Sequence, residues 1–210
     1  MPTARSGLLL LAMWSGCATA DHATASDAST HDAPRSDAHV DGHSGACAMA
    51  FSGALATYDF TGTTGSQTTT AASATAPGIT AGDISRAAGL TAASGATSIN
   101  ASGWPTAAQL DPTKYYTLSI TPPAGCSLDV TSLTADVKSS GTGPASAAVA
   151  TSADAFAQTT AVSTTAPSTP TVSVSGASGS VEIRIYGFSA TGGTGTMRVQ
   201  NTLRVTGALR

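Results

Sequence analysis

Strict alternation of apolar and polar side chains is the feature that most constrains the fold of this 210-residue chain. The segment SVEIRIYGF, residues 180–188, alternates valine and isoleucine with glutamate, arginine and tyrosine. The segments TMRVQNTLRV, residues 196–205, and YYTLSI, residues 115–120, repeat the pattern. Successive side chains of a strand point to opposite faces, so an alternation of period two predicts strands with one buried face.

Turn clusters separate these strands, and no window carries a sustained helical stripe with caps. The clusters are TPPAG, SSGTGP and ATGGTG. In residues 126–139 the apolar positions change phase near Thr131 and Ser132, which predicts a β-bulge or a short turn there. Many short strands at regular spacing predict an all-β fold, an antiparallel β-sandwich of the jelly-roll type.

The N-terminal run LLLLAMWSGC, residues 8–17, is too short to cross a bilayer, which needs about 20 apolar residues. Arg5 before it and the small residues after it are typical of a secretory signal peptide. Because the run ends on Cys17, it resembles a bacterial lipoprotein signal over residues 1–16, which implies that Cys17 is lipidated. The alternative is an ordinary signal peptide cut nearby, which leaves Cys17 as a free thiol.

In Gram-negative lipoproteins an aspartate after the lipidated cysteine favours the inner membrane, and this chain has Ala18 there. The resemblance therefore implies a lipid-anchored protein at the cell surface or on the periplasmic side of the envelope, in the outer membrane of a Gram-negative bacterium.

Residues 17–45 contain Val40 as their only aliphatic residue larger than alanine, which predicts a disordered tether. The tether holds all four histidines, at irregular spacings of four to nine residues, among five aspartates. Metal binding by histidines is one interpretation, but without a fixed spacing we favour a solvated acidic spacer. The remaining residues, 46–210, are expected to form one β-sandwich domain.

Charge and cysteine content restrict the partners of this domain. Residues 46–210 contain seven acidic and seven basic residues, and this balance gives no basic surface for nucleic acid. If Cys17 carries lipid, Cys47 and Cys126 remain, and an exported protein is expected to pair them in a disulfide. The alternative is two buried free thiols.

Several motifs resemble, in their order along residues 55–207, a jelly-roll domain of bacterial secreted proteins, including proteins with PEP-CTERM sorting signals. They include NASGW, LDPTKYYTLSITPPAG, VEIRIYGFSAT and GTMRVQNTLRVTG. The closing hairpin is similar to that of galactose-binding-like and carbohydrate-binding jelly rolls. The family is poorly characterised, so the resemblance implies a fold and a surface location more than an activity.

The resemblance also bears on metal binding. Related jelly rolls often carry Asp-Asn where this chain has Gln200 and Asn201, and the aspartate there helps to hold a structural calcium ion. The neutral Gln200 is a weaker ligand for a cation that prefers carboxylates. Asp59 and Asn201 are therefore weak calcium candidates, and no cofactor or metal is expected.

We expect no enzymatic activity. The domain lacks histidine, which excludes serine–histidine and cysteine–histidine catalysis. A glycan-active hydrolase would need two facing carboxylates about 5 to 10 Å apart. The aspartates and the glutamate instead lie in alternating strands or near turns, where solvation or capping explains them.

The expected function is that of a surface lipoprotein that binds glycan or extracellular matrix. Its partner would be a polysaccharide or a surface protein. The alternative is a structural envelope or scaffold protein without a small ligand. Stacking on sugar needs flat aromatic faces, and the candidates are Trp104, Tyr115 and Tyr186. Arg184 and Arg198 would support them if their strands adjoin. Trp104 lies in a loop, SGWP, and its alternative is to fold over the edge of the sandwich.

Overall fold

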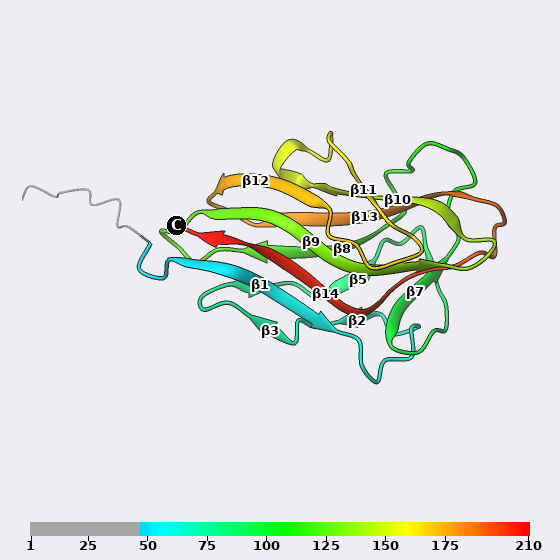
Figure 1. Ribbon diagram of the computed structural model, residues 1–210, viewed down its shortest axis with the longest axis horizontal. Helices are drawn as coiled ribbons and strands as arrows, with labels where there is room; N and C mark the ends of the chain where they lie inside the picture. The colour runs from blue at the N-terminus through cyan, green and yellow to red at the C-terminus, as the bar shows by residue number, and fades with distance from the viewer. Residues whose placement is uncertain (1–46) are drawn as a thin grey trace, which may run out of the picture. The chain divides into compact units, whose positions relative to one another are not determined.

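The computed structural model describes residues 47–210 (Figure 1). The expected signal peptide at 1–16, the tether at 17–45, the lipidation of Cys17 and the four histidines all lie outside the described residues. Within the described part, no helix is long and apolar enough to cross a bilayer.

Two antiparallel sheets make up the described structure (Figure 1). The order in the first sheet is β12–β9–β14–β1–β3, with β7 beside β14 and β6 beside β7. Its strands are β1 (Phe51–Asp59), β3 (Ala74–Thr75), β6 (Thr91–Ala92), β7 (Ser98–Ser102), β9 (Leu128–Ser139), β12 (Thr171–Ala177) and β14 (Met197–Leu209).

The second sheet has the order β11–β10–β13–β8–β5–β2, with β4 beside β8. Its strands are β2 (Thr69–Thr70), β4 (Thr80–Ala81), β5 (Ile84–Arg86), β8 (Tyr115–Thr121), β10 (Pro144–Thr151), β11 (Thr160–Val162) and β13 (Val181–Ala190). A single turn of 3₁₀ helix, η1 (Ser152–Asp154), follows β10.

The long strands alternate between the sheets. The chain passes from β8 in the second sheet to β9 in the first and back to β10, and later from β12 to β13 to β14. The first long strand, β1, pairs with the last, β14. This crossing pattern between two antiparallel sheets is that of a jelly roll, and it confirms the predicted β-sandwich.

The alternating positions form the core, as predicted. Inward residues of β13 and β14 such as Ile183, Ile185, Val199 and Leu203 are 1% exposed or less. They pack with the inward side chains of β8 and β9 into one hydrophobic cluster between the sheets. Burial of one face of each strand thus accounts for the period of two.

The predicted irregularity in β9 is a bulge at Thr131. Thr206 of β14 faces Ser132, but the next residue, Gly207, faces Val130, so Thr131 has no partner in the register. The close approach here needs glycine, because a Cβ atom at Gly207 would lie 2.0 Å from a backbone oxygen of β9. The extra residue shifts the apolar phase of β9 and keeps both halves of the strand facing the core.

Cys47 and Cys126 form a disulfide, with their Cα atoms 4.6 Å apart. The predicted pairing is confirmed, and the alternative of two free thiols is wrong. The bridge joins the segment just before β1 to the connection between β8 and β9. It therefore fixes the start of the domain to its body.

Candidate binding site on the outer face of the second sheet

Strands β8 and β13 bring three of the predicted site residues together. Their antiparallel register places Tyr186 opposite Tyr115, Arg184 opposite Thr117 and Glu182 opposite Ser119. These residues alternate with the buried side chains of both strands, so they share the outer face of the second sheet. The sequence predicted this face for Tyr115, Arg184 and Tyr186.

The guanidinium group of Arg184 lies between two aromatic rings. Its Cζ atom is 4.1 Å from the ring centroid of Tyr115 and 3.8 Å from that of Phe156. The rings of Tyr115 and Tyr186 meet edge to face with centroids 5.5 Å apart. Contacts of this kind hold the arginine in place through cation–π attraction and packing.

Phe156 comes from the turn after η1, and the sequence analysis missed it. Ala155 and Phe156 have φ values of 57° and 63°, in the left-handed region that bulky residues rarely adopt. This backbone carries the Phe156 ring over Arg184. The only sequence signal is a single phenylalanine among the small residues of TSADAFAQ.

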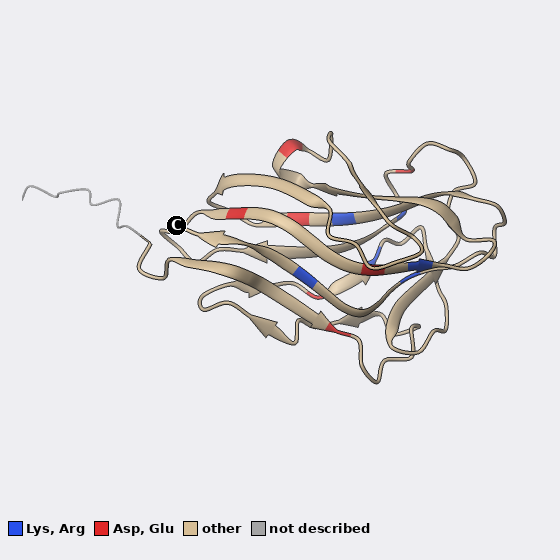
Figure 2. Ribbon diagram, in the orientation of Figure 1, with Lys and Arg blue, Asp and Glu red and all other residues tan. Residues whose placement is uncertain are grey.

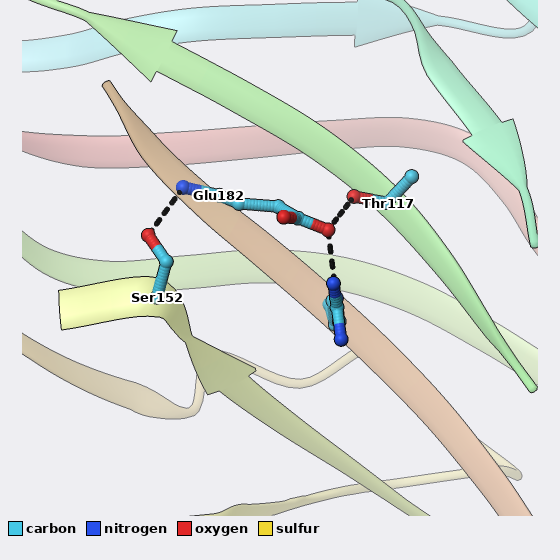
Figure 3. A network of polar contacts seen from close by, with 4 residues as sticks. Thr117, Ser152 and Glu182 are labelled. Atoms are coloured by element: carbon cyan, nitrogen blue, oxygen red, sulfur yellow. Dashed lines mark hydrogen bonds and ion pairs between the residues drawn. The ribbon is translucent and has the colours of Figure 1, made fainter. Parts of the chain in front are cut away.

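A network of polar contacts orients the Glu182 side chain (Figure 3). Arg184 donates from Nε to Glu182 Oε1 at 2.7 Å, and the Thr117 hydroxyl donates to the same oxygen at 2.8 Å. The backbone N–H of Glu182 donates to the Ser152 hydroxyl at 2.9 Å. Both hydrogen bonds to the carboxylate of Glu182 therefore end on Oε1.

These contacts set the charges of the pair. Burial raises the pKa of Glu182, but the hydrogen bonds from Arg184 and Thr117 outweigh it, so the pKa lies below its ordinary value. For Arg184, burial lowers the pKa, and the hydrogen bond and charge of Glu182 raise it above its ordinary value. Both groups are ionised at neutral pH, as an ion pair whose side chains are 35% and 20% exposed.

An open groove of about 500 Å³ lies beside this pair. It contains two carboxylates, four hydroxyl groups and one aliphatic residue. The lining residues are Asp83, Thr117, Leu118, Ser119, Ser152, Ser180 and Glu182. Charged residues are few on the strands and loops of the domain (Figure 2), so two acidic residues on one groove stand out.

Two of the predicted stacking rings are not accessible. Trp104 is 3% exposed, donates its indole N–H to the Ala101 carbonyl at 2.8 Å and packs against Tyr116 in the core. Trp104 is thus not an accessible stacking ring, and its loop packs the indole against the sandwich, as the alternative interpretation had it. Tyr186 lies on the predicted outer face but is 2% exposed, because neighbouring groups cover it. Tyr115 is half-buried.

Arg198 lies apart from this site. It belongs to β14 in the first sheet, whereas Arg184 belongs to β13 in the second. The condition that the two strands adjoin is therefore not met. Arg198 faces Lys138 of β9 instead.

The two calcium candidates are engaged in hydrogen bonds of their own. Asp59 Oδ1 accepts bonds from the backbone N–H and the hydroxyl of Thr61, at 2.8 and 2.7 Å. Asn201 donates to Asp136 Oδ2 at 2.6 Å, and Gln200 donates to the same oxygen at 2.9 Å. Within residues 47–210, no group of three His, Cys, Asp or Glu residues gathers as a metal site.

The sequence was compared with protein-family models and with curated proteins, and the structure with solved structures. None of the three comparisons finds a match. The resemblance to bacterial jelly-roll surface domains stays an inference from the sequence motifs.

Proposed function

We propose that this protein is an exported, lipid-anchored, non-catalytic surface protein whose jelly-roll domain binds glycan in the groove beside Glu182 and Asp83. The observation that carries the proposal is the set of two carboxylates and four hydroxyl groups on one groove. Sugar hydroxyls are both donors and acceptors, and carboxylates and hydroxyls are the side chains that pair with them.

The proposed contact differs from the aromatic platform expected from the sequence. The ring of Tyr115 is half-buried, and the guanidinium of Arg184 lies over it. Recognition therefore rests on hydrogen bonds to a preorganised surface. Because Arg184 and Thr117 already hold Glu182, little side-chain entropy is lost when a sugar binds there.

The pKa of Glu182 argues against this group as the general acid of a hydrolase. A glycosidase keeps one carboxyl group protonated, with a raised pKa, to protonate the leaving group. The pKa of Glu182 is lowered by its hydrogen-bond donors, so this group is a carboxylate at neutral pH. Glu182 is therefore unsuited to act as the proton donor, which supports a binding role for the groove that it lines with Asp83.

Export and anchoring are supported by the cysteines. The disulfide between Cys47 and Cys126 is typical of an oxidising compartment, and it leaves Cys17 as the remaining cysteine of the three. We place the protein on the outer membrane of a Gram-negative bacterium, attached through lipid on Cys17. Metabolic labelling with a fatty-acid analogue should mark the wild-type protein and not Cys17→Ser; equal labelling of both would reject the anchor.

One observation favours the alternative, a structural envelope protein without a small ligand. Within residues 47–210, Met49 is the only large hydrophobic residue that is exposed, at 40%. The described surface thus offers no fully exposed aromatic ring for stacking.

A glycan array probed with the full-length protein tests the proposal. Asp83 is exposed on the groove, so Asp83→Asn should leave the fold intact and weaken glycan binding about tenfold or more, since it removes a charged acceptor. Asp111→Asn is the matched control, because Asp111 caps a turn at Thr113 and does not line the groove. If the wild-type protein retains no glycan, or if both variants lose affinity equally, the structural alternative stands.

A further inference from the structure

Two cations face each other on the outer side of the first sheet. Lys138 of β9 and Arg198 of β14 are direct partners in the antiparallel register. Like charges at such positions repel, with Cβ atoms about 5 Å apart. Within the described part of the chain, neither residue forms an ion pair with an acidic side chain.

Both cations line one small hollow of about 140 Å³, together with three hydroxyl residues, Ser139, Ser140 and Thr196. Two of these five side chains contain a buried polar atom without a hydrogen-bond partner, namely Arg198 Nε and Ser139 Oγ. Residues 47–210 have only four such side-chain atoms in all. Buried polar groups are nearly always paired, so an unpartnered guanidinium nitrogen beside Lys138 marks a cationic site without its counter-charge. A further unpartnered acceptor, Oδ1 of Asn100, belongs to the residue that faces Arg198 on β7.

The nearest carboxylate in the register does not supply that partner. Asp136 lies two residues before Lys138 on the same face of β9. Its Oδ2 atom accepts hydrogen bonds from the side-chain amides of Gln200 and Asn201. Asp136 is thus held by neighbouring amides, and its contacts do not include Lys138 or Arg198.

The wall of the hollow is fixed by backbone contacts. The N–H of Ser140 donates to the Thr196 carbonyl at 2.9 Å, and the N–H of Thr196 donates to the Ser140 hydroxyl at 2.9 Å. The cations themselves project from paired strands. The hollow therefore exists before any ligand binds, which lowers the cost of binding.

We propose that this hollow binds a tetrahedral oxyanion, a sulfate or phosphate group, either free or as a monoester on a larger molecule. Arg198 offers its Nη–H groups to the oxygens of such a group, because its Nε atom is buried. Lys138 supplies the second positive charge, and Ser140 and Thr196 supply hydroxyls. The volume corresponds to about five water molecules, enough for one group of five heavy atoms.

The site is distinct from the proposed glycan groove. Lys138 and Arg198 lie on β9 and β14 of the first sheet, whereas the groove lies on β8 and β13 of the second. The two lining sets also share no residue. Oxyanion binding can therefore hold or fail independently of glycan binding.

NMR of the arginine side chains tests the proposal directly. The ¹⁵N-labelled full-length protein is titrated with sodium phosphate, and separately with sodium sulfate, at ionic strength kept constant with chloride. The guanidinium signals of Arg198 should shift saturably, because its Nη–H groups gain an anionic acceptor. Lys138→Gln and Arg198→Lys should each weaken binding at least tenfold.

Arg204→Gln is the matched control, because Arg204 is an exposed arginine of the same strand and does not line the hollow. It removes the same charge and should leave the affinity unchanged. Lys138 is exposed, so Lys138→Gln keeps the test valid even if Arg198→Lys does not fold. The proposal is overturned if the Arg198 signal does not saturate with either anion, or if Arg204→Gln and Lys138→Gln weaken binding equally.

A comparison of dextran sulfate with uncharged dextran distinguishes an esterified anion on a polymer from a free anion. An esterified sulfate on a polymer is identified if dextran sulfate binds more tightly per sulfate group than inorganic sulfate does. This tighter binding should be lost in Lys138→Gln and kept in Arg204→Gln. Binding to the inorganic anions alone identifies a free oxyanion.

Discussion

Removing the disulfide should destabilise the domain by an amount that the loop length sets. The bridge between Cys47 and Cys126 closes a loop of 80 residues (126 − 47 + 1) that runs from the start of the domain through β8. Replacing both cysteines with alanine frees this loop in the unfolded chain. The native strands keep their pairings, because the bridge lies outside the ladders.

The loss of stability follows from loop-closure entropy. The chain-entropy relation for an 80-residue loop gives about 4.5 kcal/mol at 25 °C. The buried sulfur of Cys126 adds a smaller transfer cost on top of this. Because a domain of this size is stable by roughly 5 to 15 kcal/mol, we expect the double variant to unfold at a much lower urea concentration than the wild type.

Urea unfolding in the Cys17→Ser background provides the measurement, since this background prevents pairing with a third thiol. Either single variant, Cys47→Ala or Cys126→Ala, already breaks the bridge. Each should therefore lose nearly as much stability as the double variant, so the effects are strongly non-additive. A double variant that loses less than about 1 kcal/mol, or single effects that add up to the double, would refute a loop constraint by this disulfide.

Two further predictions concern pH. Burial raises the pKa of Glu182, but the hydrogen bonds from Arg184 and Thr117 make it lower in the folded protein than in the unfolded chain. The contribution of Glu182 to stability is therefore present above the unfolded pKa. It is lost as pH falls through the folded pKa. Glu182→Gln should therefore destabilise at pH 7 and approach the wild type at pH 3 in urea unfolding; a difference independent of pH would contradict this. Burial raises the pKa values of Tyr58 and Tyr116, and Asp83 raises that of Tyr58 further, whereas the charge of Arg86 only partly opposes the shift of Tyr116. Ultraviolet titration should thus show that these two tyrosines ionise only when the protein unfolds above pH 10, and their ionisation in the folded state at pH 10 would disprove it.

The strands and their buried faces could be predicted because that information is local. A strand with one buried face places apolar residues at every second position, as residues 181–187 do, and residues 196–205 do so except at Asn201, where the register shifts. The bulge at Thr131 was equally readable, because an extra residue changes the phase of the alternation. The disulfide followed from a count of the cysteines left in a domain that the sequence predicts to be exported.

The accessibility of the aromatic rings could not be predicted in the same way. Whether Trp104 is exposed depends on how the loop between β7 and β8 packs its ring against Tyr116, and a periodic pattern does not report loop packing. Tyr186 occupies the polar phase of its strand and is still covered. The loop that places Phe156 over Arg184 depends on two left-handed residues that the sequence does not mark with glycine.

The topology explains why Arg184 and Arg198 belong to different sites although they are 14 residues apart. In a jelly roll, consecutive long strands cross from one sheet to the other, so the outward side chains of β13 and β14 face opposite sides of the sandwich. The groove with Asp83 and Glu182 and the hollow with Lys138 and Arg198 therefore lie on different sheets. Sites on opposite sheets share no side chains, and effects of substitutions that far apart usually add. Asp83→Asn should thus leave phosphate binding unchanged, and Lys138→Gln should leave glycan binding unchanged. Cross-effects between the two would mean that the faces are coupled through the core.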